Sequence, residues 1–498
     1  MGKYNVVTST RAEDLALRRL ENVPIVPPLS LAYEGILKHV ESVNEGDLNS
    51  AWFAVIGLYG SGKTLLMRRI AHESVQRYQN IIPIYFYLGK KDEILLYDSL
   101  GEYVKEVEEY VNSNKPSTRV HGQPEHWSEK LEALKEAYNK ITEERNKTEY
   151  SEDRTEYSIE LFFRVMKELN RKGYYPLILL DEFERIVYTG EGIRGSPKAI
   201  SNFDYFSQHF LELTRGHIFK GVGVIALTHD IPELVKKAKN EGFPHVSEVE
   251  KVREGDYEKL EIVSPNIVFN QKYFLHWSYE HLKTFCEKLN ISLSEDLIEI
   301  VSYTLPLPRV IVSIYNRARE LGIENVDSES FYKLIKDQLE TLISHIRKYR
   351  TKNGKLLVSH AAKWDGRLKA LLEEGYYFVK MDKLHEVSKL IREKGLMVSK
   401  KMERSEEEYE EERAFRTGRS IVETLVKYGL YHFDSVKKVY HLRPEIMAYL
   451  LQIERLPSGE KADLNRVVEI IESAIEEKRR KSEERRRKRV ESNEEKLT

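Results

Sequence analysis

Short apolar segments alternate with amphipathic segments through the first half of the chain. Four apolar runs have the length and the β-branched or aromatic content of buried strands, at residues 52–56, 81–88, 175–180 and 221–227. Segments with apolar residues at helical spacing predict helices over residues 29–43, 65–70, 99–111, 159–170 and 203–214. Strands that alternate with helices are typical of an α/β fold, in which helices cover both faces of a parallel sheet.

The same pattern divides the chain into regions, and it shows no convincing internal repeat. The predicted regions are a helical lead-in (1–50), the α/β core (51–275), a helical lid (276–348), a second small domain (355–456) and a charged helical tail (457–498).

A polar stretch at residues 112–158 interrupts the predicted core. Within it, residues 130–145 have a helical pattern and a high density of charge. Charged residues are seldom buried unless they are paired. We therefore predict that this stretch is a surface insertion and that it lies outside the core.

The composition of the 498 residues excludes several classes of protein. The single cysteine, Cys286, excludes an intramolecular disulfide and a multi-cysteine zinc site, and we expect it to pack as a small apolar residue. No segment approaches the roughly 18 uninterrupted apolar residues of a membrane span. We therefore expect a soluble, cytoplasmic protein with no membrane partner. The charged fraction of 32% is a bias seen in proteins from hot environments, such as those of many archaea.

A glycine-rich loop follows the first apolar run. Residues Gly57–Thr64 match G-x-x-x-x-G-K-[ST] in full, between a predicted strand and a predicted helix. Glycines let the backbone turn so that its N–H groups surround phosphate oxygens, and the positive end of the next helix adds to the attraction. Lys63 would reach the β- and γ-phosphates, and the Thr64 hydroxyl would ligate Mg²⁺. The loop therefore predicts ATP and Mg²⁺ as ligands, with the nucleotide contacted by Gly57, Tyr59, Gly60, Ser61, Gly62, Lys63, Thr64 and Leu65.

Two other predicted strands end in polar residues. One leads into Asp181 and Glu182, and the other is followed by Thr228 and His229. Because parallel strands end at the ligand edge of a sheet, we expect Asp181 to hold Mg²⁺ and Glu182 to activate the attacking water. Thr228, with His229 in second place, is a candidate contact of the γ-phosphate, although a turn or a helix cap explains these two residues equally simply.

The region 355–456 has the element order of a winged helix. Helices are predicted at residues 367–374, 382–393 and 416–427, followed by a β-hairpin at 430–442. Basic residues on the third helix, just before it and on the hairpin suit contacts with the phosphates of duplex DNA. These residues are Arg413, Arg416, Arg419, Lys427, Lys437 and Lys438. Winged helices also bind proteins, and the acidic run at 406–412 argues against uniform attraction to DNA.

The tail holds a further block of charge. Residues 478–489 include nine basic and two acidic residues, with glutamates on both sides. Non-specific binding of nucleic acid and a solvated helix of mixed charge both explain this block, and the sequence does not decide between them.

The order of these motifs resembles that of AAA+ ATPases: a phosphate loop, a strand ending in two carboxylates, a third strand ending in a polar residue and a helical lid. The resemblance implies arginines at the nucleotide. Arg309, in Leu307-Pro308-Arg309 at the start of a lid helix, matches the sensor-2 position, which contacts the γ-phosphate. Arg215 matches the position of an arginine finger that reaches a neighbouring subunit, and Arg185 is a weaker candidate. A surface arginine (Arg309) and a cation at a helix C-terminus (Arg215) are the alternative interpretations.

Among AAA+ ATPases, the layout is similar to that of the origin-recognition and initiator group, which joins the ATPase and lid to a C-terminal winged helix. Two features depart from that group. The third strand ends in Thr-His-Asp, where Ser-Asn is usual, and the polar insertion is atypical. ATPases of mobile elements and phage-defence systems share the same layout.

The resemblance implies an ATPase that binds or remodels duplex DNA, as in replication initiation or as a mobile-element helper, with a homo-oligomer formed through Arg215 as one option. The alternative is an ATP-dependent switch that recruits protein partners without DNA motor activity. A small-molecule kinase is disfavoured, because the chain has a long lid and C-terminal domain and offers no obvious acceptor pocket.

Overall fold

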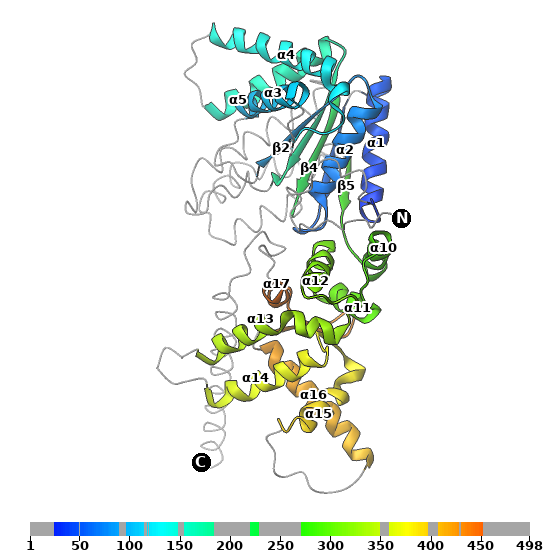
Figure 1. Ribbon diagram of the computed structural model, residues 1–498, viewed down its shortest axis with the longest axis vertical. Coiled ribbons are helices and arrows are strands. Elements are labelled where there is room, and N and C mark those ends of the chain that lie inside the picture. The colour runs from blue at the N-terminus through cyan, green and yellow to red at the C-terminus, as the bar shows by residue number, and fades with distance from the viewer. Residues whose placement is uncertain are drawn as a thin grey trace, which may run out of the picture. The chain divides into compact units, whose positions relative to one another are not determined.

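The computed structural model describes residues 24–48, 50–88, 96–113, 117, 119–147, 154–183, 220–228, 270–348, 358–396, 407–427 and 430–451. The chain divides into two compact units, Met1–His276 and Trp277–Thr498 (Figure 1). The first unit contains a sheet of five strands and the second a sheet of three.

The sheet of the first unit is parallel throughout. Its strands lie in the order β2-β3-β4-β1-β5, so the three strands that lead into predicted site residues, β3, β4 and β1, are neighbours. The strands are β1 (Ser50–Ile56), β2 (Ile81–Tyr87), β3 (Tyr175–Asp181), β4 (Gly221–Leu227) and β5 (Gln271–Phe274). The predicted α/β fold is confirmed. The short β5 lies at the edge and has no fully buried residue, which explains why the apolar pattern does not predict it.

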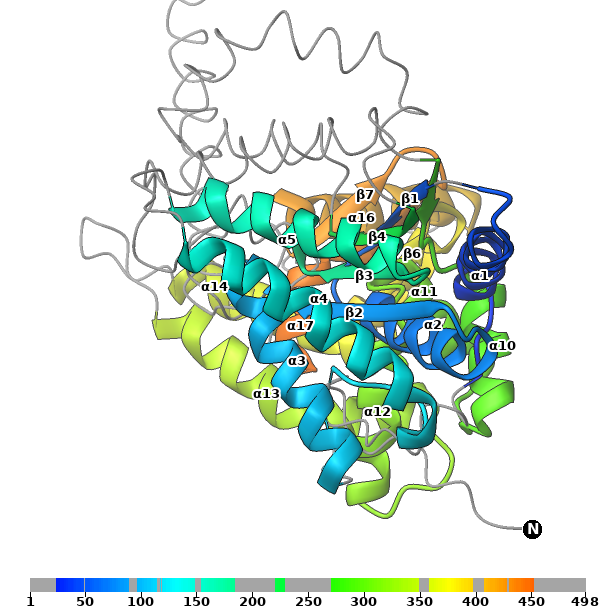
Figure 2. The same cartoon turned by 90° about the horizontal axis from the view of Figure 1, so that it is seen from above.

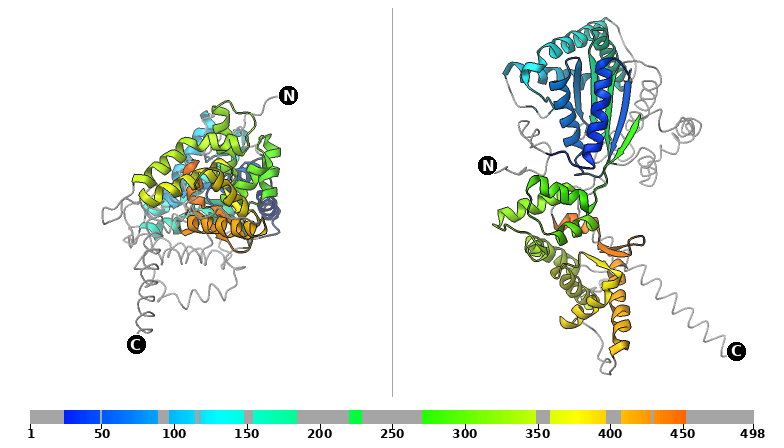
Figure 3. Two further views of the ribbon diagram at one scale, coloured as in Figure 1. Left: turned by 90° about the horizontal axis from the view of Figure 1, so that it is seen from below. Right: turned by 90° about the vertical axis from the view of Figure 1, so that its right-hand side faces the viewer.

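Helices cover both faces of this sheet (Figure 2). On one face, α1 (Leu29–Glu45) and α2 (Lys63–Arg77) lie side by side, as the right-hand view of Figure 3 shows. On the other face, α3 (Leu96–Ser113) and α5 (Arg154–Arg171) pack on the strands. Successive residues of a strand point to opposite faces, so alternate residues of β1 share one core with α3 and α5.

The prediction that residues 112–158 lie outside the core is wrong. The 3-10 turn η4 (Pro124–Trp127) and helix α4 (Ser128–Asn146) pack on α3 and α5. Trp127 and Leu134 are fully buried and belong to the same core cluster as β2 and β3. The apolar residues of α4 recur at helical spacing and form a narrow stripe, which the charged residues on the rest of the helix conceal in a simple count of polar positions.

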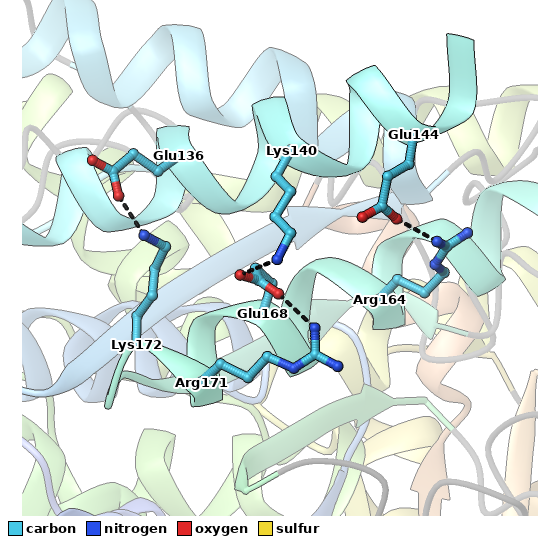
Figure 4. A network of polar contacts seen from close by, with 7 residues as sticks. All are labelled: Glu136, Lys140, Glu144, Arg164, Glu168, Arg171 and Lys172. Carbon is cyan, nitrogen blue, oxygen red and sulfur yellow. Dashed lines mark hydrogen bonds and ion pairs between the residues drawn. The ribbon is translucent and has the colours of Figure 1, made fainter. Parts of the chain in front are cut away.

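Charged residues also attach α4 to the core, because they pair with α5 (Figure 4). Glu168 of α5 is almost fully buried, and its carboxylate accepts hydrogen bonds from Lys140 (2.8 Å) and Arg171 (2.9 Å). These hydrogen bonds lower the pKa of Glu168 below its ordinary value, and the bond from Lys140 has the largest effect. Further ion pairs join the two helices and their ends: Glu144–Arg164 and Glu136–Lys172. Several charged residues of the stretch thus form ion pairs with α5 while their side chains stay partly in contact with solvent.

The second unit begins with four helices, which are α10 (Tyr279–Leu289), α11 (Glu295–Thr304), α12 (Pro308–Glu320) and α13 (Ser328–Lys348). Pro308 occupies the first turn of α12, where a missing N–H does no harm. Cys286 is buried in α10, and burial raises the pKa of its thiol to about 12, so that it packs as a neutral, small residue as predicted.

The predicted helices and hairpin of the C-terminal region are present. In chain order the elements are α14 (Val358–Glu373), β6 (Phe378–Lys380), η6 (Met381–Lys383), α15 (Leu384–Glu393), α16 (Glu407–Lys427), β7 (Tyr431–Asp434), β8 (Val439–Leu442) and α17 (Pro444–Leu450). The strands pair antiparallel in the order β6-β8-β7. Helix α16 passes close to the start of α15 at Gly418, where the absence of a side chain permits the approach. A Cβ atom there would lie only 1.8 Å from the Leu384 carbonyl oxygen.

Candidate nucleotide-binding site

The glycine-rich loop joins β1 to α2 and is tied to the neighbouring strand. Its first residue, Gly57, donates its N–H to the carbonyl of Leu227 at the end of β4 (3.0 Å). Gly60 and Gly62 have φ angles of 88° and 101°, in the left-handed region that glycine adopts without steric strain. A side chain at Gly62 would also meet Leu29, since a Cβ atom there would lie 2.9 Å from its Cδ1. The backbone conformation therefore favours glycine at Gly62, and any larger residue would also displace the end of the Leu29 side chain.

Helix α2 begins at Lys63, directly after Gly62, which has no side chain with which to cap the first N–H groups. Such a helix start offers free donors and a partial positive charge to an anion. The buried Lys63 ammonium turns back over the loop and donates to the carbonyl oxygens of Gly57 (2.6 Å) and Leu58 (3.2 Å). Loop, helix end and ammonium thus converge as phosphate binding requires.

The loop and the acidic end of β3 meet, as the sequence predicts. The Thr64 hydroxyl donates to Asp181 Oδ2 at 2.6 Å, and the Glu182 N–H donates to Oδ1 of the same carboxylate at 3.0 Å. Asp181 is fully buried. A hydroxyl and a carboxylate at one point supply the hard oxygen ligands that Mg²⁺ prefers, so these residues fit the predicted metal.

Glu182 has an unusual backbone conformation. Its φ angle is 54°, in the left-handed region, and its side chain is 7% exposed. For a residue other than glycine, such a conformation costs on the order of 1–3 kcal/mol and persists only where the surrounding structure enforces it. Outliers of this kind concentrate at functional sites, which favours a role for Glu182 beyond packing.

The loop thus joins β1 to α2 within a parallel sheet that has helices on both faces. No protein-family model matches the chain. No curated protein matches it either.

Solved structures do align with the chain at low identity. The Aeropyrum pernix ORC2 protein with ADPNP and ADP is 14% identical, with 93% of this chain and 98% of that chain covered and a TM-score of 0.37. Cdc6p of Pyrobaculum aerophilum is 13% identical (92% and 96% covered, TM-score 0.41). The Aeropyrum pernix ORC1 protein in complex with DNA is 14% identical (86% and 94% covered, TM-score 0.36). Similarity this distant carries no argument about activity, so the case for this chain rests on its own residues.

Thr228 lies at the same edge of the sheet as the loop. It is buried and follows Leu227, the last residue of β4, which pairs with Ile56 of β1. Arg309 is the second residue of α12 in the other unit and is partly exposed. Three further candidates lie outside the described residues, namely Arg185, Arg215 and His229.

One residue of this site, Tyr85 of β2, is not predicted from the sequence. Its hydroxyl donates to Asp181 Oδ2 at 2.7 Å. The ring is fully buried, and burial, followed by the nearby Asp181 charge, raises the pKa of Tyr85 well above its ordinary value. The phenol therefore keeps its proton and remains a donor. The strand holds two tyrosines, Tyr85 and Tyr87, and the sequence gives no signal that singles out Tyr85.

The predicted DNA contacts lie on α16 and in the turn between β7 and β8. On α16, Arg413, Arg416, Arg419 and Lys427 are exposed. Arg416 pairs with Glu412 (2.5 Å) and Arg419 with Glu423 (2.7 Å) of the same helix. In the turn, Lys437 and Lys438 are exposed, and the Lys437 ammonium lies 4.9 Å from the centre of the Tyr303 ring on α11. The basic tail lies outside the described residues.

Proposed function

We propose that this protein is an ATPase of the AAA+ type that binds ATP at the β1–α2 loop and hydrolyses it. The observation that carries the proposal is the 2.6 Å hydrogen bond between Thr64 and Asp181. These residues are far apart in the sequence, and each was assigned to the metal from its own motif. A glycine-rich turn that matched the motif only by chance would not be expected to contact the acidic end of another strand.

The residues around this contact have distinct roles in the proposal. The Lys63 ammonium would exchange its two carbonyl partners for β- and γ-phosphate oxygens. Thr64 and Asp181 would hold Mg²⁺, which neutralises charge on the phosphates when it is bound. Glu182 would accept the proton of the attacking water as it approaches the γ-phosphate. Thr228, at the end of β4, would contact the γ-phosphate.

Removal of the metal tests the proposed chemistry. We expect the purified chain to release phosphate from ATP in the presence of Mg²⁺, and a chelator to reduce the release to the rate without protein, because the negative charge of the phosphates would then repel the nucleophile. Phosphate release followed with and without chelator, and again after Mg²⁺ is restored, measures this. Release that continues in the chelator, or its absence under all these conditions, would count against the proposal.

We further propose that the elements α14 to β8 form a winged helix that contacts duplex DNA through its phosphates. The order of helix, strand, two helices and two strands supports this, as do the exposed basic residues on α16 and in the β7–β8 turn. One observation favours the alternative, a switch that recruits protein partners. Because Arg416 and Arg419 are paired with glutamates of their own helix, less free positive charge is available to DNA.

A salt series distinguishes the two proposals. For DNA binding, the logarithm of the affinity should fall linearly with the logarithm of the salt concentration, with a slope of about −0.9 per neutralised phosphate. Replacement of Lys437 and Lys438 by alanine should weaken binding to all sequences and reduce the slope by about 2. Replacement of the exposed Lys167 of the first unit serves as the control and should change neither quantity. Affinity that does not depend on salt would support the protein-recruiting switch.

A further inference from the structure

The carboxylate of Asp181 is held by more than the phosphate loop. Oδ2 accepts hydrogen bonds from both the Thr64 hydroxyl (2.6 Å) and the Tyr85 hydroxyl (2.7 Å), and Oδ1 accepts the N–H of Glu182 (3.0 Å). Only Thr64 belongs to the phosphate-binding loop. Tyr85 is supplied by β2, an edge strand with no other role in the site described above.

The register of the sheet explains why Tyr85 reaches this carboxylate. Tyr85 pairs with Leu179, and Asp181 follows two residues later on the same strand. Paired residues of neighbouring strands have side chains on the same face, and so do residues two apart along one strand. Tyr85 and Asp181 are therefore diagonal neighbours on one face, a distance that a tyrosine side chain can span. The contact thus follows from rigid strand pairing rather than from a loop conformation.

The Tyr85 ring is itself enclosed by two buried side chains. The ring of His121, from the segment between α3 and η4, lies edge-on to it, with 6.0 Å between centroids and 77° between planes. The guanidinium carbon of Arg68, from α2, lies 5.9 Å from the ring centroid. Neither ring nitrogen of His121 has a hydrogen-bond partner in the part of the chain that is described, and burial lowers its pKa well below the ordinary value. These two closely packed, buried side chains therefore fix the phenol and exclude water from it.

We infer that Tyr85 is a positioning residue for the metal-binding carboxylate, holding Asp181 in the orientation in which it can serve Mg²⁺ beside Thr64. The inference rests on the proposed binding of Mg²⁺ and ATP. A carboxylate held by a single side-chain donor can turn about its terminal torsion, which has a broad energy well. The second donor restricts this rotation before the metal arrives, in the way that outer partners of metal ligands orient them elsewhere. The segment that carries His121, predicted to lie outside the core, thereby supports the site.

The test replaces Tyr85 by phenylalanine, which removes one oxygen atom and keeps the ring. The matched control is Tyr103→Phe. Tyr103, on α3, is also fully buried. Its hydroxyl donates to the carbonyl of Pro83 (2.9 Å), which lies on β2 like Tyr85, and not to Asp181. Each change removes one buried hydrogen bond, so both variants should lose a similar, small amount of stability, which thermal unfolding checks.

The decisive readout is the Mg²⁺ dependence of nucleotide affinity, measured with a fluorescent ATP analogue. We expect Tyr85→Phe to require about 10-fold more Mg²⁺ than wild type or Tyr103→Phe to reach half of the metal-dependent gain in affinity. In a chelator, all three proteins should bind the analogue equally, and saturating Mg²⁺ should restore Tyr85→Phe to wild-type affinity. Equal Mg²⁺ requirements in Tyr85→Phe and Tyr103→Phe would overturn the inference while the proposed function stands. A wild-type protein that does not bind the analogue would overturn both.

Discussion

Replacement of Glu182 by glutamine is expected to lower ATP turnover by about 10²–10⁴-fold, the range that a general base contributes, and to leave ATP binding intact. Glutamine has the shape of glutamate but cannot take a proton from water. The shape matters here because Glu182 is buried and its backbone has an unfavourable φ angle of 54°, so a residue of another size would shift the side chain from its position. An isosteric change keeps that position and removes only the basic oxygen.

Phosphate release and nucleotide affinity, measured on the same preparation, separate the two effects. Glu168→Gln is the matched control, because Glu168 is another nearly buried acid of the same unit, paired with Lys140 of α4 and Arg171 of α5. That variant should turn over ATP at the wild-type rate. If Glu182→Gln also did so, the water-activating residue would have to be sought elsewhere.

The parts of the site that the sequence predicts are those whose signals are local. The spacing from Gly57 to Thr64 specifies the loop by itself, and the apolar run before Asp181 specifies a strand that ends in carboxylates. That the two meet follows from one general rule, since parallel strands end at the ligand edge of the sheet. No knowledge of the strand order is needed for this step, and the contact between Thr64 and Asp181 confirms it.

Features that depend on strand register are not predicted. The contact of Tyr85 with Asp181 requires that β2 lies beside β3 and that Tyr85 pairs with Leu179, and neither fact can be read from the spacing of residues along the chain. The positive φ of Glu182 is likewise imposed by tertiary structure against the local preference of glutamate.

The error about residues 112–158 has a different cause. An average over polar positions hides the narrow apolar stripe of α4 and the single large side chain of Trp127, although both are buried. The charged residues of α4 do lie at the surface, but Lys140 and Glu144 also pair with residues of α5, which attaches the helix to the core. The charged residues at the start of α16 also lead to a wrong predicted start for that helix. Helix α16 starts nine residues before its predicted start, because the acidic run is helical and its Glu412 pairs with Arg416 one turn later.

Removal of the Lys63 ammonium is expected to have the second large effect, a loss of ATP affinity of at least about 100-fold. Two charge-assisted hydrogen bonds to phosphate oxygens are each worth about 1.5–3 kcal/mol, and about 1.4 kcal/mol corresponds to a factor of ten. Lys63 is buried at the start of α2, with its ammonium over the loop. Alanine keeps the helix and leaves the loop glycines unchanged.

Lys130→Met is the matched control for this variant. Lys130 is a second buried lysine whose ammonium donates to two backbone carbonyls, those of Tyr78 and Gln79, just after the end of α2, and burial lowers its pKa to about 8. Its replacement should affect the stability of the first unit and leave ATP affinity unchanged.

The central claim is that a triphosphate binds where β1 meets α2, facing Asp181. Its most direct test is calorimetric titration of wild type, Lys63→Ala and Lys130→Met with a non-hydrolysable ATP analogue and Mg²⁺. We expect saturable binding to wild type and Lys130→Met, and a loss of affinity of at least about 100-fold in Lys63→Ala. A wild-type protein that gives no binding heat, or a Lys63→Ala variant that binds as tightly as wild type, would contradict it.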